Sequence, residues 1–207
     1  QHMPKSALRI PQNTAHASIW KENIEKKTHS SHLAGKGAWV MMQRSFKEKI
    51  NDDTLKKNMT KEFLDYYSQN IDKNSKPING LVDFLNWAES KKIVMAVCTN
   101  KQERLANDLL IKLDLMKYFD FVAGSDTFDF NKPDPRHLTN VVEILEGSLK
   151  KTIMVGDSEV DEMAAINAKL PFILVEDGYT GKTPREIKHD HLIKDFINFE
   201  KIINNYL

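Results

Sequence analysis

The sequence predicts an α/β fold in which a parallel sheet core is accompanied by a small helical domain. Two observations predict it. After residue 77, short apolar runs rich in Val and Ile alternate with amphipathic stretches, as in parallel strands joined by helices that cover both faces of the sheet. Before that point, from 19 to 75, the chain is polar and its apolar residues recur at helical spacing. A length of 207 residues suits one domain with a smaller insertion.

Composition and charge exclude several classes of protein. Thirty Lys and Arg residues against 29 Asp and Glu leave a net charge of +1, so no excess field attracts nucleic acid or an anionic membrane. No apolar stretch reaches the roughly 18 residues of a membrane span, and the N-terminus lacks the hydrophobic core of a signal peptide. The single cysteine, Cys98, favours a reducing compartment and a packing role. We therefore expect a cytoplasmic protein.

The helical block contains two runs with apolar faces, which we interpret as packing faces rather than as a cofactor site. The stretch "NDDTL" precedes the second run, and its Asp52 and Asp53 are expected to be helix-start charges. The first run presents Met41, Met42, Phe46 and Ile50, and the second presents Leu55, Met59, Phe63 and Tyr66 or Tyr67.

The remainder of the chain predicts four strands and five helices. A parallel sheet of this kind binds ligands at the carboxyl ends of its strands. The strands are expected at 92–100, 119–126, 152–158 and 171–178, and the helices near 80–90, 101–115, 134–146, 159–168 and 195–205.

The histidines suggest no site. His189 and His191 flank Asp190 in a predicted solvated loop, and no partner is predicted for His29, His32 or His137.

Two of these strands lead into residues that suit a phosphate group. The first ends at Thr99, whose hydroxyl, with the backbone N–H groups that open the following helix, can bind phosphoryl oxygens. The second leads to Lys132, a compact positive charge in the stiff loop "NKPDP". Taken alone, Thr99 with Asn100 could be a helix cap, and the loop could be a surface loop.

A third strand ends in residues that suit a divalent cation. Asp157 follows the apolar run "TIMV", and Asp161 lies one helical turn later on the same face. Both are hard oxygen ligands for Mg²⁺, or partners of such ligands, and a cation relieves their repulsion. Alone, Asp157 could cap its helix. The occurrence of all three features at successive strand ends favours one shared site for a phosphate and Mg²⁺.

These residues resemble the haloacid dehalogenase-like hydrolases, of the phosphoglycolate phosphatase type. "AVCTNK", "GSDTFDFNKPDP" and "MVGDSEVD" are similar to the second, third and fourth motifs of the family, and the resemblance runs from about Gly35 to the C-terminus. It implies catalytic roles for Thr99, Lys132 and Asp157. It also implies substrate binding by Thr99, Asn100 and Lys132, and metal binding by Asp157 and Asp161.

The resemblance further implies a Rossmann-like parallel sheet core with an inserted small α-helical cap domain. Residues 1–11 would be the first core strand region, apparently incomplete, 12–77 the cap and 78–207 the core. The implied activity is Mg²⁺-dependent hydrolysis of a small phosphate monoester, foremost 2-phosphoglycolate, through an aspartyl-phosphate intermediate. A related phosphomutase and a catalytically inactive phosphate- or partner-binding module are the alternatives.

The first motif of the family departs from the pattern. It should read Asp-x-Asp-Gly-Thr, with the first aspartate as nucleophile, but the chain has no aspartate before Asp52. Either Ile10-Pro11-Gln12-Asn13-Thr14 replaces the motif, or "SALRI" begins the strand, "PQNTAHASIW" begins a helix, and the segment between them is absent. We favour the second alignment, because the stretch from Ile10 to Gly35 is shorter than in relatives by about that segment.

We therefore expect the natural protein to carry additional residues between Ile10 and Pro11, because a truncated central strand would leave neighbouring strands and backbone groups unpaired. Intact-mass spectrometry of the protein isolated from its source organism tests this. The expected mass exceeds the 23.9 kDa of the sequence. A mass equal to 23.9 kDa would contradict the hypothesis and leave a chain without the family's nucleophile.

Overall fold

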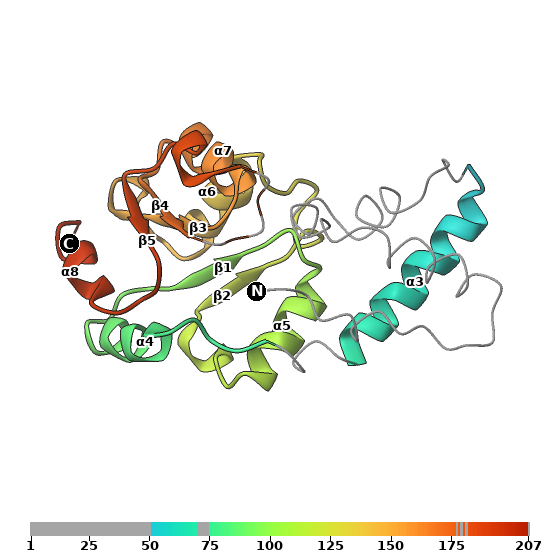
Figure 1. The fold of residues 1–207 in the computed structure, drawn as a ribbon, viewed down its shortest axis with the longest axis horizontal. Coiled ribbons are helices and arrows are strands. Elements are labelled where there is room, and N and C mark those ends of the chain that lie inside the picture. The colour runs from blue at the N-terminus through green and yellow to red at the C-terminus, as the bar shows by residue number, and fades with distance from the viewer. Residues whose placement is uncertain (1–50, 70–74, 177, 179, 181, 207) are drawn as a thin grey trace. The chain divides into compact units, whose positions relative to one another are not determined.

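The computed structural model describes residues 51–69, 75–176, 178, 180 and 182–206 (Figure 1). The chain divides into two compact units, 1–74 and 75–207. The predicted domain boundaries after residues 11 and 77 stay predictions. In the described part of the chain, no helix combines the length and the apolar character needed to cross a bilayer.

The described part of the first unit is helix α3 (Asp53–Gln69), as its apolar spacing predicts. Asp52 and Asp53 open this helix, and the Asp52 carboxylate accepts a hydrogen bond of 3.0 Å from the Leu55 N–H. Met59 is buried, in agreement with the predicted packing face. The predictions for Met41, Met42, Phe46, Ile50, His29 and His32, and for the side chains of Phe63, Tyr66 and Tyr67, lie outside the described residues.

The second unit alternates strands and helices, and every strand pairing in it is parallel, as predicted. Strands β1 and β2 form one sheet, and β3, β4 and β5 form another in that order. The elements are α4 (Leu81–Ser90), β1 (Ala96–Cys98), α5 (Glu103–Lys112), η3 (Met116–Tyr118), β2 (Phe121–Ala123), α6 (Arg136–Ile144), η4 (Leu149–Lys151), β3 (Met154–Gly156), α7 (Glu159–Ala168), β4 (Phe172–Val175), η5 (Pro184–Glu186), β5 (His191–Ile193) and α8 (Phe199–Ile203).

Strand β4 shows how the apolar runs sort onto the two faces of the three-stranded sheet. Phe172 and Leu174 pack in a cluster with α6 and α7. Ile173 and Val175 pack in a separate cluster with α8 and the apolar side of α4. Because successive strand residues point to opposite faces, a run of four buried residues needs cover on both sides. The prediction of helices on both faces is therefore confirmed.

The two sheets belong to the same unit but are not paired to each other. Among the described residues, no strand pairs with the second edge of β1 or of β3. In Figure 1, β1 rather than β2 is the strand nearer the three-stranded sheet. Helix α6 contacts β1, β2 and α7, so it spans the two sheets.

Several predictions differ from the structure in detail, including the last helix, which was predicted near 195–205 and is found as α8 at Phe199–Ile203. His191 does not lie in a solvated loop, because 191–193 form β5, which pairs with β4 through Ile173. A strand of three residues is too short to produce a recognisable alternation. Helix α5 begins at Glu103 rather than at 101, because the Lys101 N–H donates to the Thr99 hydroxyl at 3.1 Å and turns the chain before the helix.

Aromatic side chains on α4, on α8 and just before α8 form a cluster that packs both helices against the sheet. Phe199 is 2% exposed and lies edge-on to Phe84 and Phe196, at centroid distances of 4.7 and 4.9 Å. Because these rings are buried in a close-packed core, truncation of the Phe199 side chain is expected to destabilise the fold.

We expect Phe199→Ala to lower the free energy of unfolding by about 3–5 kcal/mol, since it removes the ring and leaves a cavity. Chemical denaturation monitored by circular dichroism measures this change. Ile197→Ala is the matched control, because Ile197 is 55% exposed and should change stability by less than about 0.5 kcal/mol. Equal losses in the two variants would contradict the placement of the core.

Candidate active site

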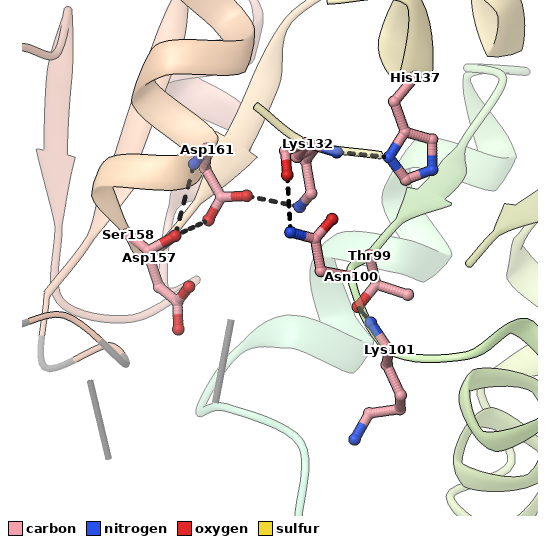
Figure 2. Close-up of polar contacts among 8 residues, drawn as sticks. All are labelled: Thr99, Asn100, Lys101, Lys132, His137, Asp157, Ser158 and Asp161. Carbon is pink, nitrogen blue, oxygen red and sulfur yellow. Dashed lines mark hydrogen bonds and ion pairs between the residues drawn. The ribbon is translucent and has the colours of Figure 1, made fainter. Parts of the chain in front are cut away.

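Lys132 is the residue on which the predicted site converges (Figure 2). Its ammonium group donates to a carboxylate oxygen of Asp161 at 2.5 Å. Its backbone carbonyl accepts from the side-chain amide of Asn100 at 2.8 Å. Asn100 follows β1, whereas Asp161 lies in α7 after β3, so these two bonds join the ends of strands from both sheets. The structure thus brings together three residues that are far apart in the sequence.

Asp161 is buried and directed inward. One of its carboxylate oxygens faces Lys132, and the other accepts from the Ser158 hydroxyl at 2.8 Å and from the Asp157 N–H at 3.1 Å. Burial alone raises the pKa of Asp161, but the charge of Lys132 and these hydrogen bonds more than offset burial, so the pKa is lowered. A side chain at Gly156 would place its Cβ 2.5 Å from the Asp161 Cβ, so only glycine fits beside this carboxylate.

Asp157 has a different orientation. The residue that caps α7 is Ser158, whose hydroxyl accepts from the Asp161 N–H, so the alternative in which Asp157 is the cap is wrong. Figure 2 shows the Asp157 carboxylate directed away from the pair formed by Lys132 and Asp161. A Cβ at Gly178 would lie 2.3 Å from the Asp157 Cβ, so the loop after β4 contacts this aspartate through bare backbone. Two carboxylates of one predicted motif therefore have separate surroundings.

Thr99 lies at the end of β1, where its N–H donates to the Ala123 carbonyl at 2.9 Å and continues the pairing with β2. Thr99 is half-buried, and its hydroxyl accepts a hydrogen bond from the Lys101 N–H at 3.1 Å, which closes a turn after β1. Of the backbone N–H groups at the start of α5, that of Glu103 donates to the carboxylate of Asp126 at 2.8 Å. That helix terminus already has an anion from the protein itself.

A pocket of about 240 Å³ adjoins Asp157. It is lined also by Glu176, Thr180 and Lys182, so two carboxylates and an ammonium group border it. Thr180 donates to Glu159 at 2.7 Å, which ties the pocket wall to α7. A cavity with a few convergent polar groups at strand ends is the usual location of a small-molecule site in this fold class.

The donor set beside the pocket fits Mg²⁺ held by few protein ligands. Among the described residues, no three His, Cys, Asp or Glu side chains group closely enough to enclose a metal ion. Mg²⁺ does not require such a cage, because it is commonly bound by one or two carboxylates together with water and substrate phosphate oxygens. Asp157 supplies a carboxylate at the pocket, and Asp161, one helical turn later, has its carboxylate bonded to Lys132 and Ser158.

Sequence reasoning missed two residues of this region. Ser158 links the start of α7 to Asp161, and the spacing Ser-x-x-Asp at a helix start is a recognisable capping pattern. His137 accepts a hydrogen bond from the Lys132 N–H on its Nδ1 at 3.1 Å, although no partner was predicted for it. Its position five residues after Lys132, beyond a stiff Pro-x-Pro turn, is the signal that was available.

Cys98, by contrast, keeps the packing role that the sequence predicts. It is half-buried against the cluster that joins α6, α7 and β4. Burial raises its pKa to about 11. A thiol that is protonated at neutral pH is a poor nucleophile, so Cys98 is not a catalytic candidate.

Comparison with known proteins decides the family. The family model for haloacid dehalogenase-like hydrolases matches residues 12–175. The chain belongs to the haloacid dehalogenase-like hydrolases. The match covers the loops of Thr99, Lys132 and Asp157 in one continuous segment, and it begins after residues 1–11, the predicted first core strand region.

Individual relatives of this haloacid dehalogenase-like hydrolase agree with that placement. A phosphoglycolate phosphatase from Agrobacterium fabrum is 38% identical over 181 residues, which are 84% of this chain and 78% of the relative. One from Mesorhizobium japonicum is 36% identical over 166 residues, covering 79% of this chain and 73% of the relative. A crystal structure described as a predicted phosphoglycolate phosphatase from Haemophilus somnus superimposes with a TM-score of 0.78 at 24% identity, covering 95% of this chain and 87% of that one.

The predictions of the family and of the α/β fold class are thereby confirmed. The roles assigned to Thr99, Asn100, Lys132, Asp157 and Asp161 stay predictions. The ion pair of Lys132 and Asp161 can be tested by stability alone, because both side chains are almost completely buried.

We expect Lys132→Met to lower the free energy of unfolding at pH 7 by about 3–5 kcal/mol, because it leaves a buried carboxylate without its counter-charge. Denaturant titration measures the loss. Lys117→Met is the matched control, since Lys117 forms an exposed pair of 2.6 Å with Asp114 and should leave stability nearly unchanged. A Lys132→Met variant as stable as wild type would contradict the buried pair.

The pH dependence follows from the same pair. In the wild type the lowered pKa of Asp161 means that its contribution is present above the ordinary value of 3.8 and is lost as the pH falls through the lower native pKa. Removing Lys132 removes the largest cause that lowers the pKa of Asp161, while burial, which raises that pKa, remains. The stability gap between Lys132→Met and the wild type should therefore narrow as the pH is lowered.

Proposed function

We propose that this haloacid dehalogenase-like hydrolase is a Mg²⁺-dependent phosphatase of small phosphate monoesters, and that 2-phosphoglycolate is its substrate. The observation that carries the proposal is the convergence of Lys132, Asn100 and Asp161, from loops after different strands, beside Asp157. The choice of 2-phosphoglycolate is based on the relatives from Agrobacterium fabrum and Mesorhizobium japonicum, which are named phosphoglycolate phosphatases.

Lys132 and Thr99 would bind the phosphoryl group. The ammonium group of Lys132 has three N–H donors, and Asp161 takes one of them at 2.5 Å, which directs the remainder. The Thr99 hydroxyl accepts from the Lys101 N–H and in that arrangement donates its own hydrogen elsewhere. Donors fixed in advance stabilise developing negative charge without reorganisation. Asn100 would act through Lys132, because its amide binds the Lys132 carbonyl.

Asp157 would hold Mg²⁺, and Asp161 would keep Lys132 and the start of α7 in position. Bound Mg²⁺ supplies charge neutralisation and orientation of the phosphate. The separation of roles follows from orientation, since Asp161 faces Lys132 and Ser158 while Asp157 borders the pocket. The residues that line this pocket after β4, with Glu176 and Lys182 among them, would contact the remainder of the substrate.

The nucleophile is the element that the chain does not display, because no aspartate precedes Asp52. This observation favours a second candidate, a catalytically inactive module that binds phosphate esters or a partner on the same fold. The two candidates share the phosphate site and differ in turnover. A phosphomutase, the further alternative, would transfer the phosphoryl group rather than release it.

Phosphate release from 2-phosphoglycolate, with Mg²⁺ and with EDTA, tests the proposal, together with calorimetric titration of inorganic phosphate. Turnover that requires Mg²⁺ is the expected result. Mg²⁺-dependent phosphate binding without turnover would instead establish the inactive module. If the protein shows no turnover and also binds no phosphate, both candidates are overturned.

Thr99→Val should weaken phosphate binding, or lower kcat/KM where turnover occurs, by about tenfold to a thousandfold, because it removes one fixed donor. Thr99→Ser is the control that keeps the hydroxyl, and we expect its value to stay within about fivefold of wild type. A loss in the serine variant equal to that in the valine variant would contradict the assigned role of the hydroxyl.

A further inference from the structure

We infer that His137 is a positioning residue for Lys132: by accepting the hydrogen bond of the Lys132 N–H, it aims the Lys132 ammonium group at the phosphate site. The inference rests on the proposed function in one respect only, since it takes Lys132 to be the residue that binds the phosphoryl group.

Three separate bonds fix Lys132, one on each of its polar groups (Figure 2). Asp161 binds the ammonium group, Asn100 binds the carbonyl, and His137 Nδ1 accepts from the N–H at 3.1 Å. The first two come from elements on either side of the site. The third comes from the first turn of α6, the helix that spans the two sheets. His137 therefore ties the Lys132 backbone to the framework that joins the sheets.

The surroundings of His137 define its protonation state. The side chain is fully buried, and its ring lies edge-on to Phe128 at a centroid distance of 5.9 Å. Because Nδ1 accepts from the Lys132 N–H, that nitrogen carries no hydrogen, and a neutral ring has its hydrogen on Nε2. Burial, followed by the charge of Lys132, lowers the pKa of His137, while the backbone of Ala123 and Gly124 acts in the opposite direction. A neutral acceptor is thus the form that this position favours.

A residue chosen only for packing at this position would be apolar. Leu138 and Val141 on the same helix are buried to nearly the same degree as His137 and carry no polar atoms. A buried imidazole is costly when its nitrogens lack partners, and among the described residues Nε2 has no hydrogen-bond partner, so the bond that compensates for burial is the one from the Lys132 N–H to Nδ1. The position therefore requires an acceptor for the Lys132 N–H in addition to bulk.

Three variants separate positioning from packing. His137→Asn keeps an acceptor near the place of Nδ1, whereas His137→Leu keeps the bulk and removes the acceptor. Val141→Ala makes a cavity one turn further along α6 without a described contact to Lys132. For each variant we propose three measurements on the full chain: thermal unfolding, hydrogen exchange of the Lys132 amide by NMR, and the affinity for inorganic phosphate in the presence of Mg²⁺.

We expect His137→Leu to accelerate exchange of the Lys132 amide and to weaken phosphate binding by about tenfold, since a buried N–H loses its partner. His137→Asn should restore both values to within about threefold of wild type. Val141→Ala should lower the unfolding temperature and change neither value. This pattern supports positioning, because a packing role would affect only the unfolding temperature.

Two results would overturn the inference. Unchanged amide exchange and phosphate affinity in His137→Leu would show that the contact positions nothing. Equal losses in His137→Asn and His137→Leu would show that shape rather than the acceptor matters. Failure of the wild type to bind phosphate is a distinct outcome: it overturns the proposed function and the functional half of the inference, while the Lys132 amide still decides whether His137 holds the loop.

Discussion

The buried ion pair between Lys132 and Asp161 is the interaction on which the site depends. Both side chains are withdrawn from water, and desolvation of two charges is repaid only when each also makes further hydrogen bonds. Here Asp161 accepts from Ser158 and from the Asp157 N–H, and the backbone of Lys132 is bound by Asn100 and His137. These bonds satisfy the Asp161 carboxylate and fix the backbone of Lys132, and the ion pair joins the ends of strands from two separately paired sheets.

The two carboxylates of the fourth motif, Asp157 and Asp161, look equivalent in the sequence but have different orientations and contacts in the structure. Asp157 and Asp161 flank the first turn of α7, but Ser158 rather than Asp157 caps that helix. Asp161 then turns inward to Lys132, and Asp157 is directed to the pocket beside Glu176 and Lys182. One short motif thus presents one carboxylate to the pocket and another to a buried ion pair, through orientation alone.

Much of the fold could be predicted from sequence, because its signals are local. The buried runs around β3 and β4 are apolar and bounded by polar residues, and α7 coincides with its predicted range of 159–168. Strand β5 was missed, because three residues at the edge of a sheet owe their conformation to pairing with β4. The partners of Lys132 differ in this respect: His137 follows it by only five residues, beyond the Pro-x-Pro turn, whereas Asn100 is 32 residues away in the sequence and reaches it through tertiary packing.

Glycine sets a limit on how this site can be altered. Gly156 lies against Asp161 and Gly178 against Asp157, each so close that even a methyl group would collide with the neighbouring aspartate. Redesign for larger or differently charged ligands therefore has little freedom on the side of the two carboxylates. The adaptable wall is the one that carries Glu176, Thr180 and Lys182, where side chains rather than bare backbone face the pocket.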